Sequence, residues 1–351
     1  MATETKEKTN NKKSAADKFK NLVRIEGYLK ENTLEIVTDA KGQHIRGNLT
    51  IAVDEVNTHV VGFYVNKFYS TGTENKNYEA IAALVPANTL TIASYLQSTP
   101  TANFMTAANA STKVVVLGKL KERVRRDPDT KKDVSYIMIE GQKAFIKKLD
   151  ERHPFEPSAT FNVDMYIENK VAETKKDENG DTVETGRYII TGLIPTYGDY
   201  VYRIPFVTSA DNDVSEYVND NYEKTQTANF QGYLVSASHR EEVASKGWGT
   251  AQTQYRTTFT RERIITGGAP GYPKDSGDEG AISTEDIKEY LVNREARIEE
   301  SESKTVRAQG STGSGFGSAA GTTQPATATA PAASAPASNK PASDAFGKWS
   351  F

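Results

Sequence analysis

The sequence predicts a mainly β protein with two consecutive small barrels, a C-terminal helix and disordered tails. The order strand, strand, strand, helix, strand, strand occurs twice among its 351 residues. A local signature, an apolar strand with an internal glycine, also recurs, as IEGYLKEN at 25–32, VLGKLKER at 116–123 and FQGYLVSA at 230–237. Glycine inside a strand commonly marks a bulge or sharp bend, which a small closed barrel needs.

The first half of the chain starts with a lysine-rich arm, residues 1–20, that has almost no apolar residue and is expected to be disordered. Residues 21–152 form the first predicted domain. Its strands are expected at 21–30, 47–53, 59–69, 113–126 and 134–148. The last two would form a hairpin across the turn sequence DPDTKK. Between the strands at 59–69 and 113–126 we expect a helix over 78–85 and a further strand near 90–96.

The second half repeats the pattern after a proline-containing linker, with a second domain over residues 158–267. Its strands are expected at 159–171, 187–194, 200–207, 228–238 and 252–265, with a helix over 211–222. Ser283 and Asp286 approximate a capping box, which predicts a helix over 283–301. Five strands with a helix after the third is the order of the OB-fold, a Greek-key barrel. The predicted architecture is therefore two tandem OB-fold barrels.

The C-terminal segment 302–351 is predicted to be a disordered linker. Of its last 44 residues, 34 are Ala, Gly, Ser, Thr or Pro, and this composition cannot bury enough surface to offset chain entropy. The tip nevertheless carries Phe346, Trp349 and Phe351. Aromatic side chains at the end of a tether have no core to join, so they are predicted to bind a partner.

The composition of the chain excludes several classes of function. The chain has no cysteine, which excludes disulfides and thiolate zinc sites, and its formal charge of −3 excludes a wholly basic nucleic-acid coat. With no long apolar run and no signal peptide, we expect a soluble, cytoplasmic protein. No GxxxxGK[ST], GxGxxG, HExxH or GxSxG motif occurs. We therefore expect no enzymatic activity, no cofactor and no metal.

One segment is locally basic. Residues 113–148 contain 11 Lys and Arg against 5 Asp and Glu. Strand alternation places four of these cations on one face of the predicted hairpin, Lys119, Lys121, Arg123 and Arg125, and Arg126 follows directly. A solvated hairpin face would look similar, but such a concentration in the protruding hairpin of a barrel favours phosphate binding.

A protein that binds single-stranded nucleic acid without sequence preference also needs aromatic rings on which the bases stack. Alternation predicts that Tyr28 shares an outward face with Arg24, and that Tyr64 and Phe68 lie opposite the core residues of 59–69. In the second half several tyrosines, Tyr233 among them, could serve. The candidates there are Trp248, in the glycine-flanked loop KGWGT, with Arg203 and Arg256.

The opening NLVRIEGYLKENTLEIVTDAKGQHIRGNLTIAVDE and the segment KVVVLGKLKERVRR resemble bacterial and phage single-stranded DNA-binding proteins. The overall plan, an OB-fold followed by a tether and a short peptide ending in phenylalanine, is similar too. Two features differ: the family usually has one OB domain, and its terminal peptide is strongly acidic. The resemblance implies a phage-type variant in the host cytoplasm. It would coat and protect single-stranded DNA in replication, recombination or repair, and recruit enzymes through its tip. The alternative is a β-barrel structural protein of a virion.

Overall fold

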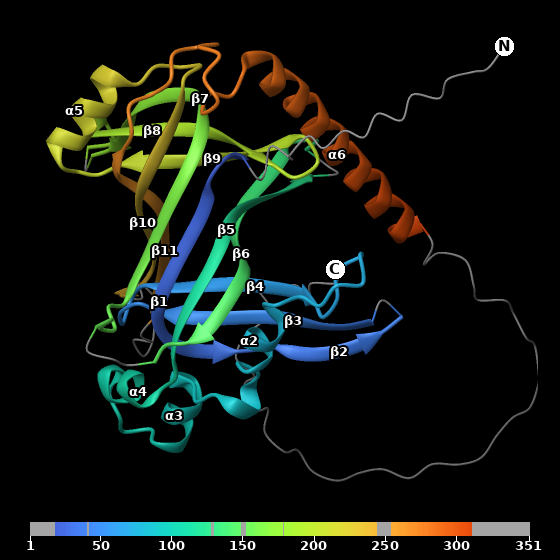
Figure 1. Ribbon diagram of the computed structural model, residues 1–351. Helices are drawn as coiled ribbons and strands as arrows, with labels where there is room; N and C mark the ends of the chain where they lie inside the picture. The colour runs from blue at the N-terminus through green and yellow to red at the C-terminus, as the bar shows by residue number, and fades with distance from the viewer. Residues whose placement is uncertain are drawn as a thin grey trace, which may run out of the picture. The chain divides into compact units, whose positions relative to one another are not determined.

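The computed structural model describes residues 18–40, 42–127, 130–148, 152–177, 179–243 and 254–310. Residues 1–17 of the predicted arm and the tip residues Phe346, Trp349 and Phe351 lie outside these residues. The chain groups into one compact unit ending at Val306 and a second unit from Arg307. The first unit holds both barrels (Figure 1).

Barrel 1 is a closed five-stranded barrel with strand order β1-β3-β4-β6-β5-β1, in which only β4 and β6 are parallel. In chain order, a helical segment separates the third strand of the barrel, β4, from the fourth, β5. This is the OB-fold topology. The elements are β1 (Asn21–Asn32), β2 (Glu35–Asp39), β3 (Gly42–Ala52), β4 (Thr58–Asn66), α2 (Tyr78–Ala82), η1 (Pro86–Asn88), α3 (Ile92–Ser98), α4 (Phe104–Ala110), β5 (Lys113–Arg126) and β6 (Asp133–Ile146).

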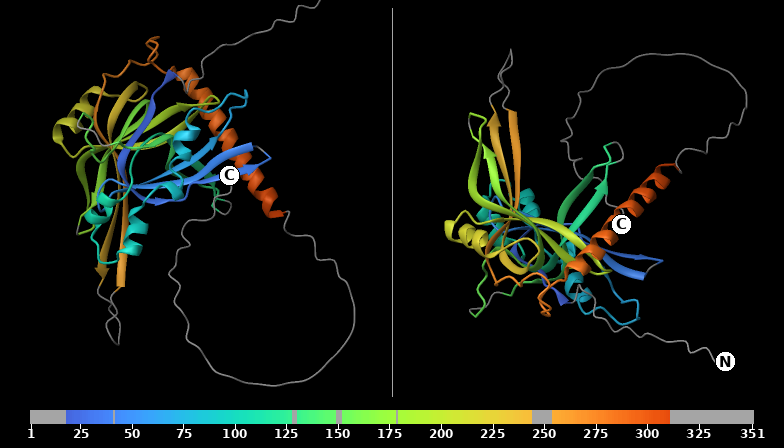
Figure 2. Two further views of the ribbon diagram at one scale, coloured as in Figure 1. Left: turned by 60° about the horizontal axis from the view of Figure 1, so that its bottom comes forward. Right: turned by 90° about the horizontal axis from the view of Figure 1, so that it is seen from above.

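Barrel 2 repeats this topology with the order β7-β8-β9-β11-β10-β7, and β9 and β11 are its parallel pair. Helix α5 lies between its third and fourth strands. Its long β10–β11 hairpin extends beyond the rest of the barrel (Figure 2). The elements are β7 (Ser158–Lys176), β8 (Thr182–Thr196), β9 (Tyr200–Thr208), α5 (Asn212–Asn221), β10 (Thr227–Val243) and β11 (Gln254–Gly268), followed by α6 (Thr284–Gly310). The predicted mainly β fold is confirmed.

The two barrels share one sheet because their first strands pair. Residues 21–26 of β1 lie antiparallel to residues 158–163 of β7, and the two strands run side by side in Figure 1. Inward-facing side chains of β1 (Val23, Ile25) and of β7 (Phe161) belong to the same hydrophobic cluster. One core therefore extends through both barrels.

The recurring glycine signature has a structural cause. Gly118 of β5 and Gly232 of β10 occupy the fourth strand of each barrel, and the strand register shifts beside each of them. A Cβ atom at Gly118 would lie 2.5 Å from the Glu140 carbonyl oxygen, and one at Gly232 would lie 1.8 Å from that of Ile264. Only glycine fits these bulges. The third copy differs, because the register of β1 shifts between Leu29 and Glu31 rather than at Gly27.

The structure differs from the predicted elements in the following respects. The strand expected near 90–96 is helix α3, because the Thr91 hydroxyl accepts the Ser94 N–H at 3.0 Å in a capping box. Strand β2 was missed, because its residues are almost all exposed and lack an apolar alternation. Helix α6 begins after Ser283, as predicted. It continues to Gly310 rather than ending at 301, because most of residues 302–309 are good helix formers.

Helix α6 ties the β5–β6 hairpin to barrel 2. The Arg294 guanidinium donates two hydrogen bonds to the buried Glu122 carboxylate of β5, at 2.7 and 3.2 Å, and Glu122 also accepts the backbone N–H of Arg203 on β9 at 2.9 Å. On the same helix, Arg297 lies over the Tyr200 ring at 3.8 Å from its centroid. A buried carboxylate with these three donors holds one side of the hairpin in place.

We expect Glu122→Gln to lower the free energy of unfolding by about 3–5 kcal/mol, because it leaves the buried Arg294 guanidinium without a counter-charge. Glu295→Gln is the matched control. It removes a half-exposed carboxylate from the ion pair with Arg126 and should cost at most about 1 kcal/mol. Urea denaturation of the full chain measures both. Equal effects of the two substitutions would show that the buried pair does not hold the hairpin.

Candidate nucleic-acid interface

The outer face of the β5–β6 hairpin carries the predicted basic stripe. From Leu117 on, the odd-numbered residues of β5 point outward, whereas Val116 and Leu120 are buried in the barrel. The four cations therefore share one face, as alternation predicted. Their cross-strand neighbours on β6 are Glu140 beside Lys119, Met138 beside Lys121, Tyr136 beside Arg123 and Val134 beside Arg125.

Charge on this face is only partly compensated. Lys121 forms an ion pair with Glu140, while Lys119 and Arg125 form no ion pair within the described part of the chain. Tyr136 is 37% exposed. Burial raises the pKa of its hydroxyl, and the charges of Arg123 and Arg125 act in the opposite direction. The ring thus lies within the field of two guanidinium groups, on the same face as the lysines.

The other two predicted arginines nearby do not belong to this face. Arg126 lies on the opposite side of β5 and pairs with Asp133 at 2.9 Å and with Glu295 of α6. The Arg203 guanidinium, on β9, donates to both oxygens of Glu168 at 2.8 and 2.6 Å. Both guanidinium groups are already bound by carboxylates, and whether either also contacts DNA stays a prediction.

Tyr64 lies on the adjoining outer face of β3 and β4. It is 40% exposed, and its ring packs against that of the buried His44, with centroids 4.9 Å apart. Its cross-strand neighbour Arg46 pairs with Glu35 at 2.5 Å. In OB-folds the faces of the second and third strands and the hairpin of the last two strands bind oligonucleotides. Tyr64 and the β5–β6 hairpin occupy these places.

Phe68 lies just beyond the end of β4 and is 52% exposed. The Lys67 ammonium lies 5.8 Å from its ring centroid. The predicted outward orientation of Tyr64 and Phe68 is confirmed, since Val61, Phe63 and Val65 fill the core from the same strand. Whether either ring stacks on a base stays a prediction.

The prediction that Tyr28 is an exposed ring is wrong. Alternation does place Tyr28 on the outward face of β1 with Arg24, but the residue is only 9% exposed. Residues of α3 and α4 pack over it, and the Phe155 ring meets it edge-on with centroids 5.0 Å apart. The parity was correct, and a distant part of the chain covers this end of the strand.

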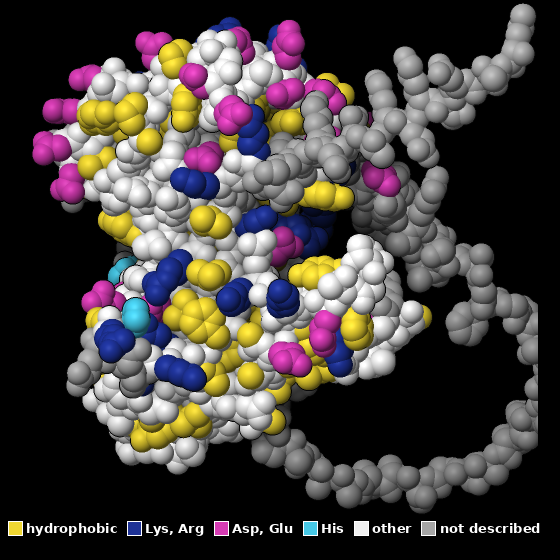
Figure 3. Space-filling model, in the orientation of Figure 1, with side chains coloured by type: hydrophobic (Ala, Val, Ile, Leu, Met, Phe, Trp, Pro, Cys, Tyr) yellow, Lys and Arg dark blue, Asp and Glu magenta, His cyan; other side chains and the backbone are white. Residues whose placement is uncertain are grey.

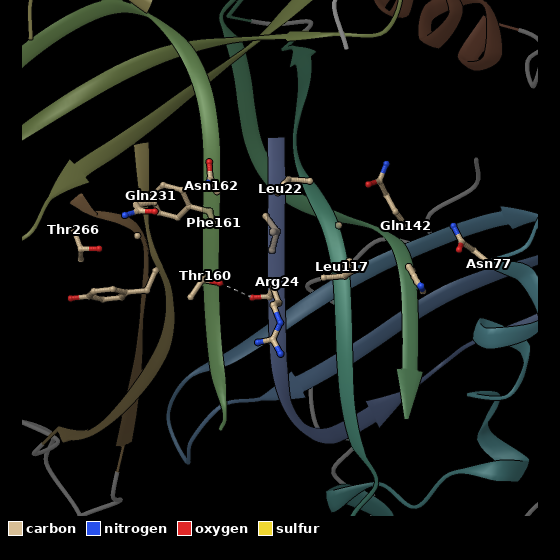
Figure 4. Close-up of a pocket in the computed structure, with 15 residues that line it drawn as sticks. Leu22, Arg24, Asn77, Leu117, Gln142, Thr160, Phe161, Asn162, Gln231 and Thr266 are labelled. Carbon is tan, nitrogen blue, oxygen red and sulfur yellow. Dashed lines mark hydrogen bonds between the residues drawn. The ribbon is translucent and has the colours of Figure 1, made fainter. Parts of the chain in front are cut away.

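Arg24 lies in a groove of about 710 Å³ on the outer face of the sheet that the barrels share. In Figure 4 its side chain stands between Thr160 of β7 and Leu117 of β5, which are its neighbours in the sheet register. The register continues to Tyr233 beyond Thr160 and to Lys143 beyond Leu117. Both barrels therefore contribute to the groove.

Barrel 2 offers fewer of the predicted residues. Trp248 lies outside the described residues, and Arg256 lies opposite Glu241 near the start of β11. The balance of charge also differs: residues 21–148 contain 17 Lys and Arg against 13 Asp and Glu, and residues 158–268 contain 11 against 16. On the face in Figure 3, Asp and Glu side chains gather over α5, whereas Lys and Arg gather around the middle. Barrel 1 is the better match for a polyanion.

Sequence reasoning missed Tyr136 as a site residue. The residue follows Ser135 in the strand predicted at 134–148, and its parity with Met138 and Glu140 could have shown an outward ring. Its position opposite Arg123 depends on the register in which β5 and β6 pair. No local sequence pattern in the turn between them specifies that register.

The strand connectivity and this exposed surface define a tandem OB-fold protein with a basic, aromatic outer face on its first barrel. The chain belongs to the YorF family, whose model matches residues 20–304. A search of curated proteins found no match.

Two solved structures are similar to this chain: the wild-type single-stranded DNA-binding protein from Thermus aquaticus and a deletion mutant of it. They have TM-scores of 0.37 and 0.34, and each is 10% identical in sequence. The alignments cover 74% and 73% of this chain and 96% of each of those chains. With such low TM-scores, neither likeness bears on what this chain binds.

No described helix is long and apolar enough to span a membrane. No group of three or more metal-binding side chains occurs within the described ranges.

Proposed function

We propose that this protein binds single-stranded DNA, without catalysing a reaction on it, along the outer face of barrel 1. The observation that carries the proposal is the outer face of the β5–β6 hairpin. It combines four cations at alternate positions of β5 with the half-exposed ring of Tyr136. Cations hold phosphates in place, and exposed rings stack on unpaired bases.

The remaining surface agrees with a single strand rather than a duplex. Tyr64 and Phe68 add exposed rings on the adjoining side of the barrel, and bases can stack on such rings only when they are not paired with a second strand. The proposed role is to coat and protect DNA exposed during replication, recombination or repair in the cytoplasm. A structural role in a virion would need none of these exposed rings beside cations.

Replacing Lys119, Lys121, Arg123 and Arg125 together with alanine should weaken oligo-dT binding and flatten its salt dependence. Each lost phosphate contact lowers the log–log slope by about 0.7 for a single strand, so we expect a change of roughly two to three. Electrophoretic mobility shifts at a series of salt concentrations measure the slope.

The control for this variant removes three exposed lysines from barrel 2, Lys175, Lys176 and Lys224, and should leave the slope nearly unchanged. If both variants lose the same affinity, binding follows net charge and the hairpin is not the site. If the unmodified protein does not bind oligo-dT at all, the structural alternative is favoured.

Tyr64→Ala should reduce the affinity for oligo-dT by about 1–3 kcal/mol, because it removes a stacking platform. The melting temperature should change little, since the ring is 40% exposed. Tyr217→Ala is the control, because Tyr217 is a 51% exposed tyrosine on the acidic helix α5. Fluorescence anisotropy and thermal denaturation together decide the matter: lower stability with unchanged affinity would assign Tyr64 to packing.

The C-terminal tip completes the proposal, and its support comes from sequence alone. Phe346, Trp349 and Phe351 would recruit replication or recombination enzymes, because the predicted linker would raise the effective concentration of the tip that it carries. Deleting residues 343–351 should leave oligo-dT affinity intact and remove such enzymes from a pull-down. Identical partner lists for the full and truncated chains would contradict recruitment.

A further inference from the structure

The groove between the barrels offers a surface that the proposed hairpin site does not use. A row of neighbours on five adjacent strands crosses it, in the order Lys143, Leu117, Arg24, Thr160 and Tyr233. At ordinary strand spacing this row is roughly 19 Å long. It begins in barrel 1 and ends in barrel 2.

The chemistry of this row suits a nucleic-acid strand. Its cations, Arg24 and Lys143, come from barrel 1, and Tyr233 at the barrel 2 end is 41% exposed. Between them Leu22, 52% exposed, and Leu117, 37% exposed, form an apolar floor. A groove that binds single-stranded nucleic acid places cations where they contact phosphates, and apolar and aromatic side chains where they contact bases.

Arg24 can contact a phosphate without leaving a buried charge unpaired. It forms an ion pair with Glu26, whose side chain is only 3% exposed. That carboxylate has two further partners, the Lys147 ammonium at 3.4 Å and the backbone N–H of Glu156 at 3.3 Å. The Arg24 side chain is itself 45% exposed, so its guanidinium can turn toward a ligand while Glu26 keeps two donors.

The groove is also continuous with the hairpin site. Leu117 and Lys119 are successive outward residues of β5, and Lys121, Arg123 and Arg125 follow along the same face. A nucleic-acid strand bound to the hairpin can therefore reach the groove along the same outward face of β5. This continuity and the two cations favour a polyanion over an apolar partner.

We propose that the bound single strand continues from the hairpin through this groove, where a base stacks on Tyr233 and Arg24 and Lys143 contact phosphates. This inference rests on the proposed function and adds barrel 2 to the binding path. It assigns the groove, and with it Tyr233, to oligonucleotides long enough to extend past the hairpin.

The test compares oligo-dT of two lengths, 8 and 30 nucleotides, on the full chain. Tyr233→Ala should bind the longer oligonucleotide about tenfold more weakly and the shorter one as the unmodified protein does. Arg24→Gln with Lys143→Gln should flatten the salt slope for the longer oligonucleotide alone. Tyr197→Ala, which removes a 77% exposed tyrosine of barrel 2 outside the groove, should change neither.

Three results would overturn the groove path. Unchanged affinity of Tyr233→Ala for both lengths, while the hairpin variant still fails to bind, rejects the groove and leaves the proposed function standing. A lower sedimentation mass for Tyr233→Ala than for the unmodified protein would show that a second copy covers this face. No binding of either length by the unmodified protein rejects the proposed function itself.

Discussion

The antiparallel pairing of β1 with β7 is the constraint on which the rest of the structure depends. Six residues of each barrel's first strand are in register, so the inner faces of the barrels merge into one core and their outer faces into one surface. Because the paired strands are antiparallel, the barrels are related by an approximate two-fold axis through the pair. The equivalent bulges at Gly118 and Gly232 flank it on either side.

The same arrangement explains why each barrel's last hairpin reaches the other barrel. The β5–β6 hairpin contacts β9 through Glu122 and the Arg203 N–H. The β10–β11 hairpin forms a bridge between Ala237 and Asn57 of barrel 1. Two barrels on a flexible linker could turn independently, whereas these contacts make barrel orientation part of the fold.

The β5–β6 hairpin divides its charge between two tasks. Its inner-side carboxylate Glu122 and its neighbour Arg126 are neutralised by partners on α6. Its outer side keeps Lys119 and Arg125, which no carboxylate among the described residues neutralises. Because one face of the hairpin is held rigidly, the cations on its other face are already ordered. Binding an anion there would cost little conformational entropy of the protein.

Local patterns were sufficient for much of this architecture. Alternation identified the β4 core residues and the outward side of Tyr64, the repeated strand order predicted two OB-fold barrels, and Ser283 marked the start of α6. These features depend on neighbours within a few residues. What covers a given face depends on segments far away in sequence, and only the tertiary structure decided it. Tyr28 has the parity of an exposed ring, yet α3, α4 and Phe155 bury it. Arg126 reads as one more cation of the stripe, yet α6, about 170 residues further on, binds it. The groove between the barrels follows from the pairing of β1 with β7, and strand pairing between distant segments is set by packing and register rather than by local propensity.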